Sequence, residues 1–511
     1  MTGPRTSASL PPSALTSDRR AAELARLVDG WRPDVLVVGA GFTGAGIALD
    51  AAARGLEVAV VDRGDLANGT SRWSSKLAHG GLRYLAKGDI GLAHESAVER
   101  GLLMEHIAPH LTRALPFVTP LNDGMPSSAG VLSGLGYVAG NALRIAAGTS
   151  NRTLPGPRWL TPRGVRARVP AVDRSGLVGG WLNTDGQLVD DARLVVAIAR
   201  TAAAFGAAVL PRVAAVEVHR DRAMLDVDGE HVEVHAGRVV VAAGAWSDTL
   251  DRRVRLRPSR GVHLVLDAAA LGRPTAALSA PVPGHLNRFV FALPQPDGRI
   301  YLGLTDDPVD GDVPDETTVT PEERTFLLGS IERVLAHPID PAHVVGGYGG
   351  YRPLVAGDTE ATADLSRAHL VLDDADGPLT IVGGKLTTYR RMAADVVDRL
   401  TDRPCTTARQ PLVGALPRRR LDWVAARAWL VGRYGSEAEV LEDLIADDPS
   451  LGRRVLDHLP YLRAELVFAL QREGATTAPD LVDRRTRIGL VPADREAALP
   501  VAEALLDRHA S

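Results

Sequence analysis

The stretch SSKLAHGGLRY, residues 74–84, places four polar side chains around a Gly-Gly pair. Those side chains are Lys76, His79, Arg83 and Tyr84. Together they can carry positive charge, donate hydrogen bonds and exchange a proton, which is the equipment for handling an anionic substrate. Lysine is otherwise almost absent from this chain, which has only Lys76, Lys87 and Lys385. Because arginine serves wherever a general cation suffices, Lys76 and Lys385 indicate a specific chemical need.

A glycine fingerprint precedes this stretch and predicts the elements that position it. Residues 34–63 contain a buried type of strand, a turn on Gly39, Gly41 and Gly44, a helix, and a second strand that ends at Asp62. In such a unit the glycines permit the tight turn, the approach to a pyrophosphate and close helix packing, and the helix N-terminus holds the diphosphate. An acidic residue at the end of the second strand favours FAD or NAD over NADP.

Composition limits the classes of function. The chain has 511 residues, a net charge of −4 and a pI near 6.4, which argues against nucleic-acid binding because a clustered positive field is missing. The length predicts about three units. A single cysteine, Cys405, gives neither a disulfide nor a cysteine-based metal site, so we expect no metal and a cytoplasmic, reducing location.

The pattern of strands and helices predicts an α/β protein with a discontinuous cofactor domain. Arg238–Asp248 and Leu379–Leu400 look like returns to the first sheet, and strands that resemble an inserted antiparallel sheet lie between them. The expected parts are a flexible extension at 1–31, a cofactor domain at 32–115, 185–255 and 345–402, a cap at 116–184 and 256–344, and a C-terminal helical domain at 405–511.

Several motifs resemble one flavoprotein family when they are taken in order. The motifs are GAGFTGAGIALDAAARGL, SSKLAHGGLRYL, DDARLV, GYRPL, GGKLTTYR and, near the C-terminus, LVDRRTRIGL. They resemble the FAD-dependent, quinone-linked glycerol-3-phosphate dehydrogenases of aerobic glycerol metabolism. The resemblance spans Asp34 to Leu490 and implies a Rossmann-like FAD domain of the glutathione-reductase or D-amino-acid-oxidase type beneath a cap. The sequence departs from the family pattern at GLTD, residues 303–306, and at IVGGK, the segment that ends at Lys385.

The resemblance also implies a reaction and its cofactor. A non-covalent FAD takes a hydride from sn-glycerol 3-phosphate, dihydroxyacetone phosphate forms, and a membrane quinone is then reduced. An oxidase that uses oxygen shares nearly every motif and stays open as an alternative. A related amine or amino-acid oxidase would need a carboxylate site, and a flavin-binding regulator would not need the cluster of Arg352, Arg367 and Lys385.

Residue roles follow from the same resemblance. Substrate binding is expected from Arg83, Tyr84, Arg352, Arg367 and Lys385. Catalytic roles are expected from His263, Arg83, Lys385 and His79, with His263 as the first candidate for the general base and His79 as the second. FAD is expected to contact Gly39, Gly41, Gly44, Asp62, Thr70, Ser71, Ser75, Lys76, His79, Gly80, Gly244, Gly383, Gly384, Lys385, Leu386 and Thr387. Simple packing for His263, a surface position for Arg367 and helix capping for Lys385 are the alternatives.

A membrane contact would have to come from the protein surface. Residues 416–431, LPRRRLDWVAARAWLV, combine three arginines with two tryptophans on an expected helix, which suits a peripheral contact with the inner face of the cell membrane. An ordinary packed helix with a basic end explains the same residues. A homodimer stays open as the assembly.

Overall fold

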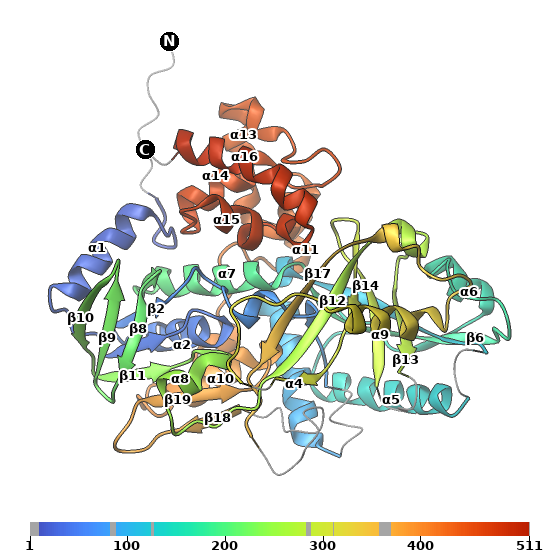
Figure 1. Ribbon diagram of the computed structural model, residues 1–511, viewed down its shortest axis with the longest axis horizontal. Helices are drawn as coiled ribbons and strands as arrows, with labels where there is room; N and C mark the ends of the chain where they lie inside the picture. The colour runs from blue at the N-terminus through green and yellow to red at the C-terminus, as the bar shows by residue number, and fades with distance from the viewer. Residues whose placement is uncertain are drawn as a thin grey trace.

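Two large sheets, a small three-stranded sheet and a helical unit make up the described part of the protein. The structure is a computed structural model that describes residues 10–81, 88–123, 127–282, 288–309, 311–356 and 369–509. The lobe built on the first sheet lies at the left of Figure 1, the cap lobe at the right, and the C-terminal helices above both. This arrangement confirms the predicted α/β fold with a cap sheet and a C-terminal helical unit.

The first sheet has the strand order β18-β19-β11-β1-β2-β7. Its strands are β1 (Val35–Val38), β2 (Val58–Asp62), β7 (Ala208–Pro211), β11 (Arg238–Val241), β18 (His369–Leu372) and β19 (Leu379–Gly383). All neighbours are parallel except β18, which runs antiparallel to β19 at the edge. The carboxyl ends of β1, β2, β11 and β19 therefore meet at one edge, which is where α/β proteins bind nucleotides.

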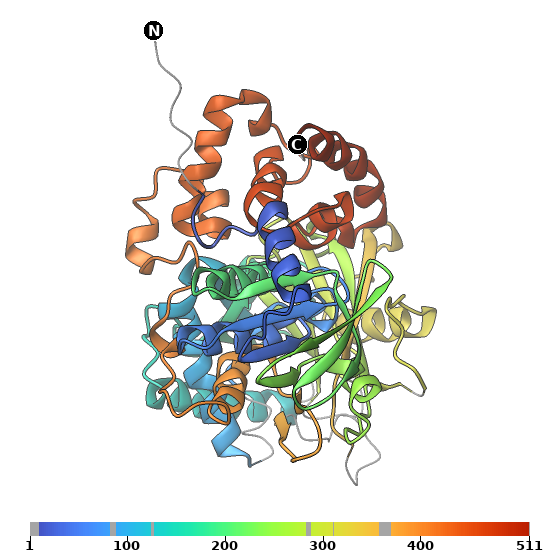
Figure 2. The same ribbon diagram turned by 90° about the vertical axis from the view of Figure 1, so that its left-hand side faces the viewer.

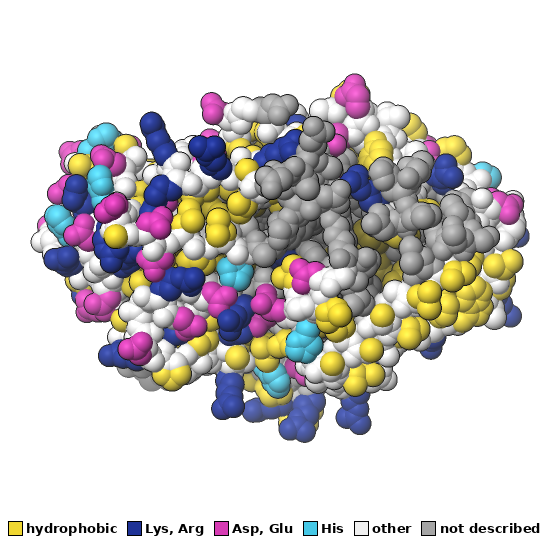
Figure 3. Space-filling model, turned by 90° about the horizontal axis from the view of Figure 1, so that it is seen from below, with side chains coloured by type: hydrophobic (Ala, Val, Ile, Leu, Met, Phe, Trp, Pro, Cys, Tyr) yellow, Lys and Arg dark blue, Asp and Glu magenta, His cyan; other side chains and the backbone are white. Residues whose placement is uncertain are grey.

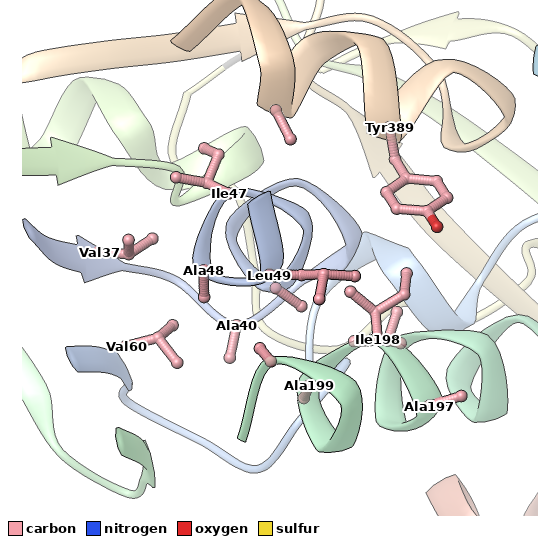
Figure 4. Close-up of a cluster of buried hydrophobic side chains, with 14 of the residues drawn as sticks. Val37, Ala40, Ile47, Ala48, Leu49, Val60, Ala197, Ile198, Ala199 and Tyr389 are labelled. Atoms are coloured by element: carbon pink, nitrogen blue, oxygen red, sulfur yellow. The ribbon is translucent and has the colours of Figure 1, made fainter. Parts of the chain in front are cut away.

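Small residues let the helices pack closely on this sheet. The helices are α2 (Phe42–Ala53), α7 (Asp191–Ala204) and α10 (Tyr389–Val397). Ala48 and Ile47 of α2, Ile198 of α7 and Tyr389 of α10 meet in one buried cluster with Val37 of β1 (Figure 4). This alanine-rich core fixes the position of the α2 N-terminus against the sheet edge.

The cap sheet has ten strands: eight follow the order β16-β12-β15-β14-β13-β4-β6-β3, and β17 pairs with β12 and β5 with β6 beside this path. The strands are β3 (Leu77–Ala78), β4 (Thr112–Leu121), β5 (Arg158–Leu160), β6 (Gly179–Leu188), β12 (Ser259–Asp267), β13 (Ala277–Pro281), β14 (Phe289–Pro294), β15 (Arg299–Gly303), β16 (Asp307–Pro308) and β17 (Val344–Arg352). It is not purely antiparallel as expected, because β13 and β4 run parallel. The predicted boundaries at 115/116 and 184/185 fall inside β4 and β6, which pair along their full length.

Helices cover the outside of the cap sheet and the junction between the lobes. They are α4 (Ile90–Leu102), α5 (Ser127–Ala146), α6 (Pro162–Arg168) and α9 (Pro321–Glu332), whereas the short helix α8 (Ser247–Leu250) lies in the first lobe. A three-stranded sheet of β8 (Ala214–Val218), β9 (Arg222–Val227) and β10 (Glu230–His235) extends the first lobe. Helices α4 and α5 form the underside of the molecule in Figure 1.

The N-terminal region differs from the expected flexible extension. Residues Ser17–Val28 form α1, which Thr16 caps through its side chain. Arg19 donates to the carbonyl oxygens of Ala203 and Ala207, and the Leu15 amide donates to Arg472 O. Helix α1 therefore packs between the first sheet and the C-terminal helices (Figure 2). These long-range partners outweigh the polar composition that suggested flexibility.

The C-terminal unit consists of the helices α11 (Arg418–Leu421), α12 (Ala428–Tyr434), α13 (Ala438–Asp447), α14 (Arg463–Arg472), α15 (Ala478–Asp480) and the longer α16 (Pro492–His509). The expected helix over 416–431 is thus two short helices. Trp429 donates its indole N–H to Glu465, whereas Trp423 is 79% exposed. Among the described residues, no helix is both long and apolar enough to span a bilayer.

Candidate functional site

The turn after β1 leaves no room for a side chain at Gly39 or Gly44. A Cβ atom at Gly44 would lie 1.7 Å from the Gly39 carbonyl oxygen. At Gly39, where φ is +108°, a Cβ atom would lie 2.5 Å from Ala242 O. Both neighbours are backbone atoms, so neither can move aside cheaply. The turn is therefore pressed against the first turn of α2 on one side and the end of β11 on the other.

The groups around this turn suit a diphosphate and a ribose. The first hydrogen bond of α2 runs from the Ala45 amide to Gly41 O, so the amides of Thr43 and Gly44, which come before it, have no acceptor within the helix. The Phe42 amide donates to Ser71 Oγ at 3.0 Å. Amides at a helix start that have no partner within the helix attract anions, so these amides are suited to bind the cofactor diphosphate.

Asp62 closes the other side of the turn. Its Oδ2 accepts from the Ala40 amide at 2.7 Å and its Oδ1 accepts from the Gly64 amide at 2.8 Å. A carboxylate oxygen has two lone pairs, so each oxygen can accept a further hydroxyl. The residues therefore fit FAD: a cradle without side chains, helix-start amides and an acceptor for ribose hydroxyls.

Two further glycine turns reach the same sheet edge. Gly244 has φ of +60°, and Gly383 and Gly384 have φ of +80° and +74°. Lys385 then caps the short 3₁₀ helix Leu386–Thr388, which leads into α10. The predicted helix start at Lys385 is thus confirmed, and the structure brings this turn to the same edge as the fingerprint turn through the parallel strands.

Helix α4 ties Lys385 to the opening stretch. The Lys385 Nζ donates to Ser96 Oγ at 2.7 Å, and Arg100, one turn further along α4, pairs with Asp185 at 2.6 Å. A Cβ atom at Gly80 would lie 2.3 Å from the Arg100 guanidinium. Sequence reasoning missed this helix, although Ser96 and Arg100 at i and i+4 mark a polar face.

His79 and Thr70 come from the two ends of the segment that joins β2 to the cap sheet. His79 follows β3 and is partly exposed, next to the Gly80 amide, which donates to Asp185 Oδ2 at 3.4 Å. Thr70 donates its hydroxyl to Tyr351 O at 2.6 Å, which joins the segment after β2 to the cap strand β17. Leu386 and Thr387 are buried, and their short helix contacts β3, the strand before His79.

His263 is enclosed in the cap sheet. Its Nε2 lies 2.9 Å from Ser75 Oγ, and its ring stacks on Tyr348 with centroids 4.8 Å apart. Its Nδ1 is buried and has no hydrogen-bond partner among the described residues. Burial, followed by the charges of Lys76 and Arg352, holds the pKa of His263 well below its usual value. The imidazole is therefore neutral at physiological pH.

Arg352 lies at the end of β17, on the strand next to His263. It donates to Ser259 Oγ, Thr305 O and Asp306 Oδ1, each at 3.1 Å. Ser259 pairs with Arg352 across the strands and is four residues from His263, so the two positions share a face of β12. The other expected substrate residues, Arg83, Tyr84 and Arg367, lie outside the described residues.

Lys76 differs from the expectation that its ammonium binds cofactor oxygens. Its Nζ donates to Arg72 O at 2.8 Å, Ser74 O at 3.0 Å and Asp191 Oδ2 at 2.9 Å, which uses all three N–H groups. Lys76 and Arg487 hold the pKa of Asp191 below its usual value despite burial. Three acceptors around one ammonium define a buried ion pair, so Lys76 holds the loop in shape.

The motif LVDRRTRIGL packs against the same loop from the C-terminal unit. Arg484 and Arg485 donate to the buried Asp65 at 2.6 and 2.7 Å. Arg487 donates to Arg72 O at 2.8 Å. Three arginines from a separate unit thus fix the segment between Asp65 and Lys76. The RRTR run is the signal in the sequence, but its partners are more than 400 residues away.

Comparisons with known proteins agree with this geometry. Residues 34–389 match the family described as FAD dependent oxidoreductase, and residues 405–510 match the C-terminal domain of alpha-glycerophosphate oxidase. The chain is 48% identical to Glycerol-3-phosphate dehydrogenase 1 of Mycobacterium tuberculosis, over 97% of this chain and 99% of that protein. A Synechocystis glycerol-3-phosphate dehydrogenase is 30% identical over 90% of each chain.

Solved structures show the same fold. The glycerol-3-phosphate dehydrogenase of Bacillus halodurans, complexed with FAD, superposes with a TM-score of 0.73 and 26% identity, covering 96% of this chain and 94% of that one. The L-alpha-glycerophosphate oxidase of Mycoplasma pneumoniae, with FAD bound, shares the fold with a TM-score of 0.57 at 16% identity over 75% of this chain and 99% of that one.

Proposed function

This chain belongs to the FAD-dependent glycerol-3-phosphate dehydrogenases, and we propose that it oxidises sn-glycerol 3-phosphate to dihydroxyacetone phosphate and passes the electrons to a membrane quinone. The enzyme would then work as a peripheral protein on the inner face of the cell membrane. The observation that carries the proposal is the pairing of a cofactor cradle with the cap arginine Arg352.

Arg352 is proposed to bind the substrate phosphate. A guanidinium suits a phosphate dianion because its planar N–H groups can donate in pairs. The Arg352 side chain is 21% exposed, and it is held by hydrogen bonds to Asp306 and Ser259. Its orientation is therefore set before a substrate arrives, which limits the entropy lost on binding.

A histidine is proposed to take the hydroxyl proton while the carbon-bound hydrogen leaves as a hydride. When bound, FAD supplies the acceptor for that hydride. Of the two candidate histidines, the geometry favours His79, because His263 has both ring nitrogens enclosed and its Nε2 held by Ser75. His263 then has a positioning role toward Ser75 and the adjoining loop. This differs from the sequence-based expectation, in which His263 is the first candidate for the general base.

Lys385 is proposed to add positive charge beside the flavin ring. Lys385 stands at the start of a helical segment, directly after two glycines in the left-handed region. Its ammonium is buried and donates a hydrogen bond to Ser96. Fixed positive charge in a dry site stabilises negative charge that develops during the reaction. Lys76 is already engaged by Asp191 and does not share this role.

An assay of purified enzyme with bound FAD and the variant Arg352→Ala tests the function. Loss of a charged partner for the phosphate should lower kcat/KM by about 30- to 1000-fold, equivalent to about 2–4 kcal/mol, while FAD content stays unchanged. Arg260→Ala is the matched control, because Arg260 is adjacent to Ser259 and lies on the opposite face of β12.

Electron acceptors are compared in the same preparation. Flavin reduced anaerobically by glycerol 3-phosphate should be reoxidised much faster by a soluble quinone analogue than by oxygen. Peroxide formation at the quinone rate would instead identify an oxidase. Unchanged kinetics of Arg352→Ala would refute the phosphate-binding role.

A further inference from the structure

Helix α5 presents a continuous apolar face to solvent. Val131, Leu135, Val138 and Ile145 are each between 59% and 65% exposed. They stand at i, i+4, i+7 and i+14, which is one side of a helix. In the described part of the chain, fifteen large hydrophobic side chains are exposed, and four of them lie on this one helix. The apolar exposure is therefore concentrated on this helix.

The other side of α5 is fixed to the cap sheet. A Cβ atom at Gly134 would lie 2.6 Å from the Trp181 ring, and one at Gly130 would lie 2.7 Å from Leu121. The hydroxyl groups of Tyr137 and Thr119 are 2.7 Å apart and hydrogen-bonded. Because this side is locked onto β4 and β6, the apolar face cannot turn inward.

The position of α5 suits contact with an extended surface. The helix lies along the underside of the molecule (Figure 1), and the view from below shows hydrophobic side chains gathered over the right-hand part of that face (Figure 3). Trp159, 46% exposed, packs edge-on against Trp181, which in turn contacts α5. A half-exposed tryptophan beside an apolar face is typical of a protein at a lipid interface.

The charge of the surrounding segment is one-sided. Residues 124–172 contain six arginines and no acidic residue, although the whole chain carries a net charge of −4. The arginines are Arg144, Arg152, Arg158, Arg163, Arg166 and Arg168. Arg152, Arg158 and Arg163 are exposed. Exposed arginines next to an apolar face complement a surface that is anionic outside and apolar inside.

We propose that α5 seats this protein on an anionic lipid leaflet, with Val131, Leu135, Val138 and Ile145 in the boundary between headgroups and acyl chains. This proposal deepens the quinone-linked function, since it names the surface that meets the membrane. It differs from the contact expected at residues 416–431, where Trp423 is the exposed tryptophan. A second copy of the chain would offer apolar area without explaining the one-sided charge.

Vesicle binding by the holoenzyme tests the proposal. The variant combines Val131→Gln, Leu135→Gln and Val138→Gln, and vesicles contain either phosphatidylcholine alone or equal parts of phosphatidylcholine and phosphatidylglycerol. Binding to the anionic vesicles should weaken at least about tenfold, because each apolar side chain contributes to insertion. The parent enzyme should bind neutral vesicles more weakly than anionic vesicles, and its binding to anionic vesicles should weaken at high salt. Phe326→Gln on α9, another exposed apolar position, is the matched control.

The outcomes separate this proposal from the proposed function. Activity with a soluble acceptor should stay at the parent level in the triple variant, since these residues lie outside the site. Unchanged vesicle binding would overturn the α5 proposal while leaving the enzyme function intact. Loss of binding in Trp423→Gln with retention in the triple variant would overturn it in favour of residues 416–431. A smaller assembly in light scattering with unchanged vesicle binding would overturn it in favour of a second copy.

Discussion

The dinucleotide turn and the C-terminal arginine interface stabilise neighbouring segments by opposite means. The turn at Gly39–Gly44 depends on missing side chains, because backbone atoms occupy the positions of the Cβ atoms. The interface of Asp65 with Arg484 and Arg485 depends on charged side chains that are removed from water. The first is a steric requirement that any added atom violates, and the second is an electrostatic balance that fails when one partner is lost.

The two regions act on one segment. Asp62 binds the turn, and three residues later Asp65 binds the C-terminal unit. The chain between Asp65 and Lys76 carries Ser71 and Ser75 and is held by Arg487 at Arg72 O. The cofactor cradle therefore depends on a helical unit that does not itself form the cradle.

The largest expected effect comes from filling the turn. Gly44→Val should abolish FAD binding and destabilise the protein by more than about 4 kcal/mol, because its Cβ would meet the Gly39 carbonyl oxygen. Flavin absorbance and urea unfolding measure both. Gly329→Ala in α9, where no atom lies within 4 Å of the added Cβ, should be neutral or stabilising. A yellow, stable Gly44→Val protein would break the steric account.

A smaller effect is expected from unbalancing the interface. Asp65→Asn should lower the free energy of unfolding by about 3–5 kcal/mol, since Arg485 loses the carboxylate that it contacts and Arg484 keeps only Asp480. FAD retention should fall with it because the cradle segment loosens. Asp315→Asn, which removes the exposed partner of Arg63, should change stability by less than about 0.5 kcal/mol. Equal effects at both sites would show that burial does not strengthen the interface.

A still smaller and pH-dependent effect is expected from Asp480. Burial raises its pKa, but Arg485 and Arg484 outweigh burial and hold the pKa of Asp480 below its usual value. A carboxyl group with a lowered folded pKa stabilises fully above its unfolded pKa of about 3.8 and loses that contribution as the pH falls. The difference in the free energy of unfolding between the parent and Asp480→Asn should be constant from pH 7 to about 5. It should become smaller below about pH 4. A gap independent of pH would contradict the lowered pKa.

The sequence motifs and the structure each identify only some of the expected substrate-binding residues. The motifs around Arg352 and Lys385 identified positions that the structure places on a cap strand and at a helix start, while Arg83, Tyr84 and Arg367 lie outside the described residues. Sequence reasoning ranked His263 above His79, but enclosure of the His263 ring is a property of three cap strands that meet around it.

The sequence by itself determined the fingerprint turn, the acid at Asp62 and the glycine turn before Lys385. These are local steric and capping signals, in which the residue type at one position restricts the backbone within a few residues. Only the tertiary structure decided that Lys76 binds Asp191, that α1 packs on the first sheet, and that residues 416–431 break into two helices. A buried charge takes its role from whichever partner the fold brings to it, and that partner can lie anywhere along the chain.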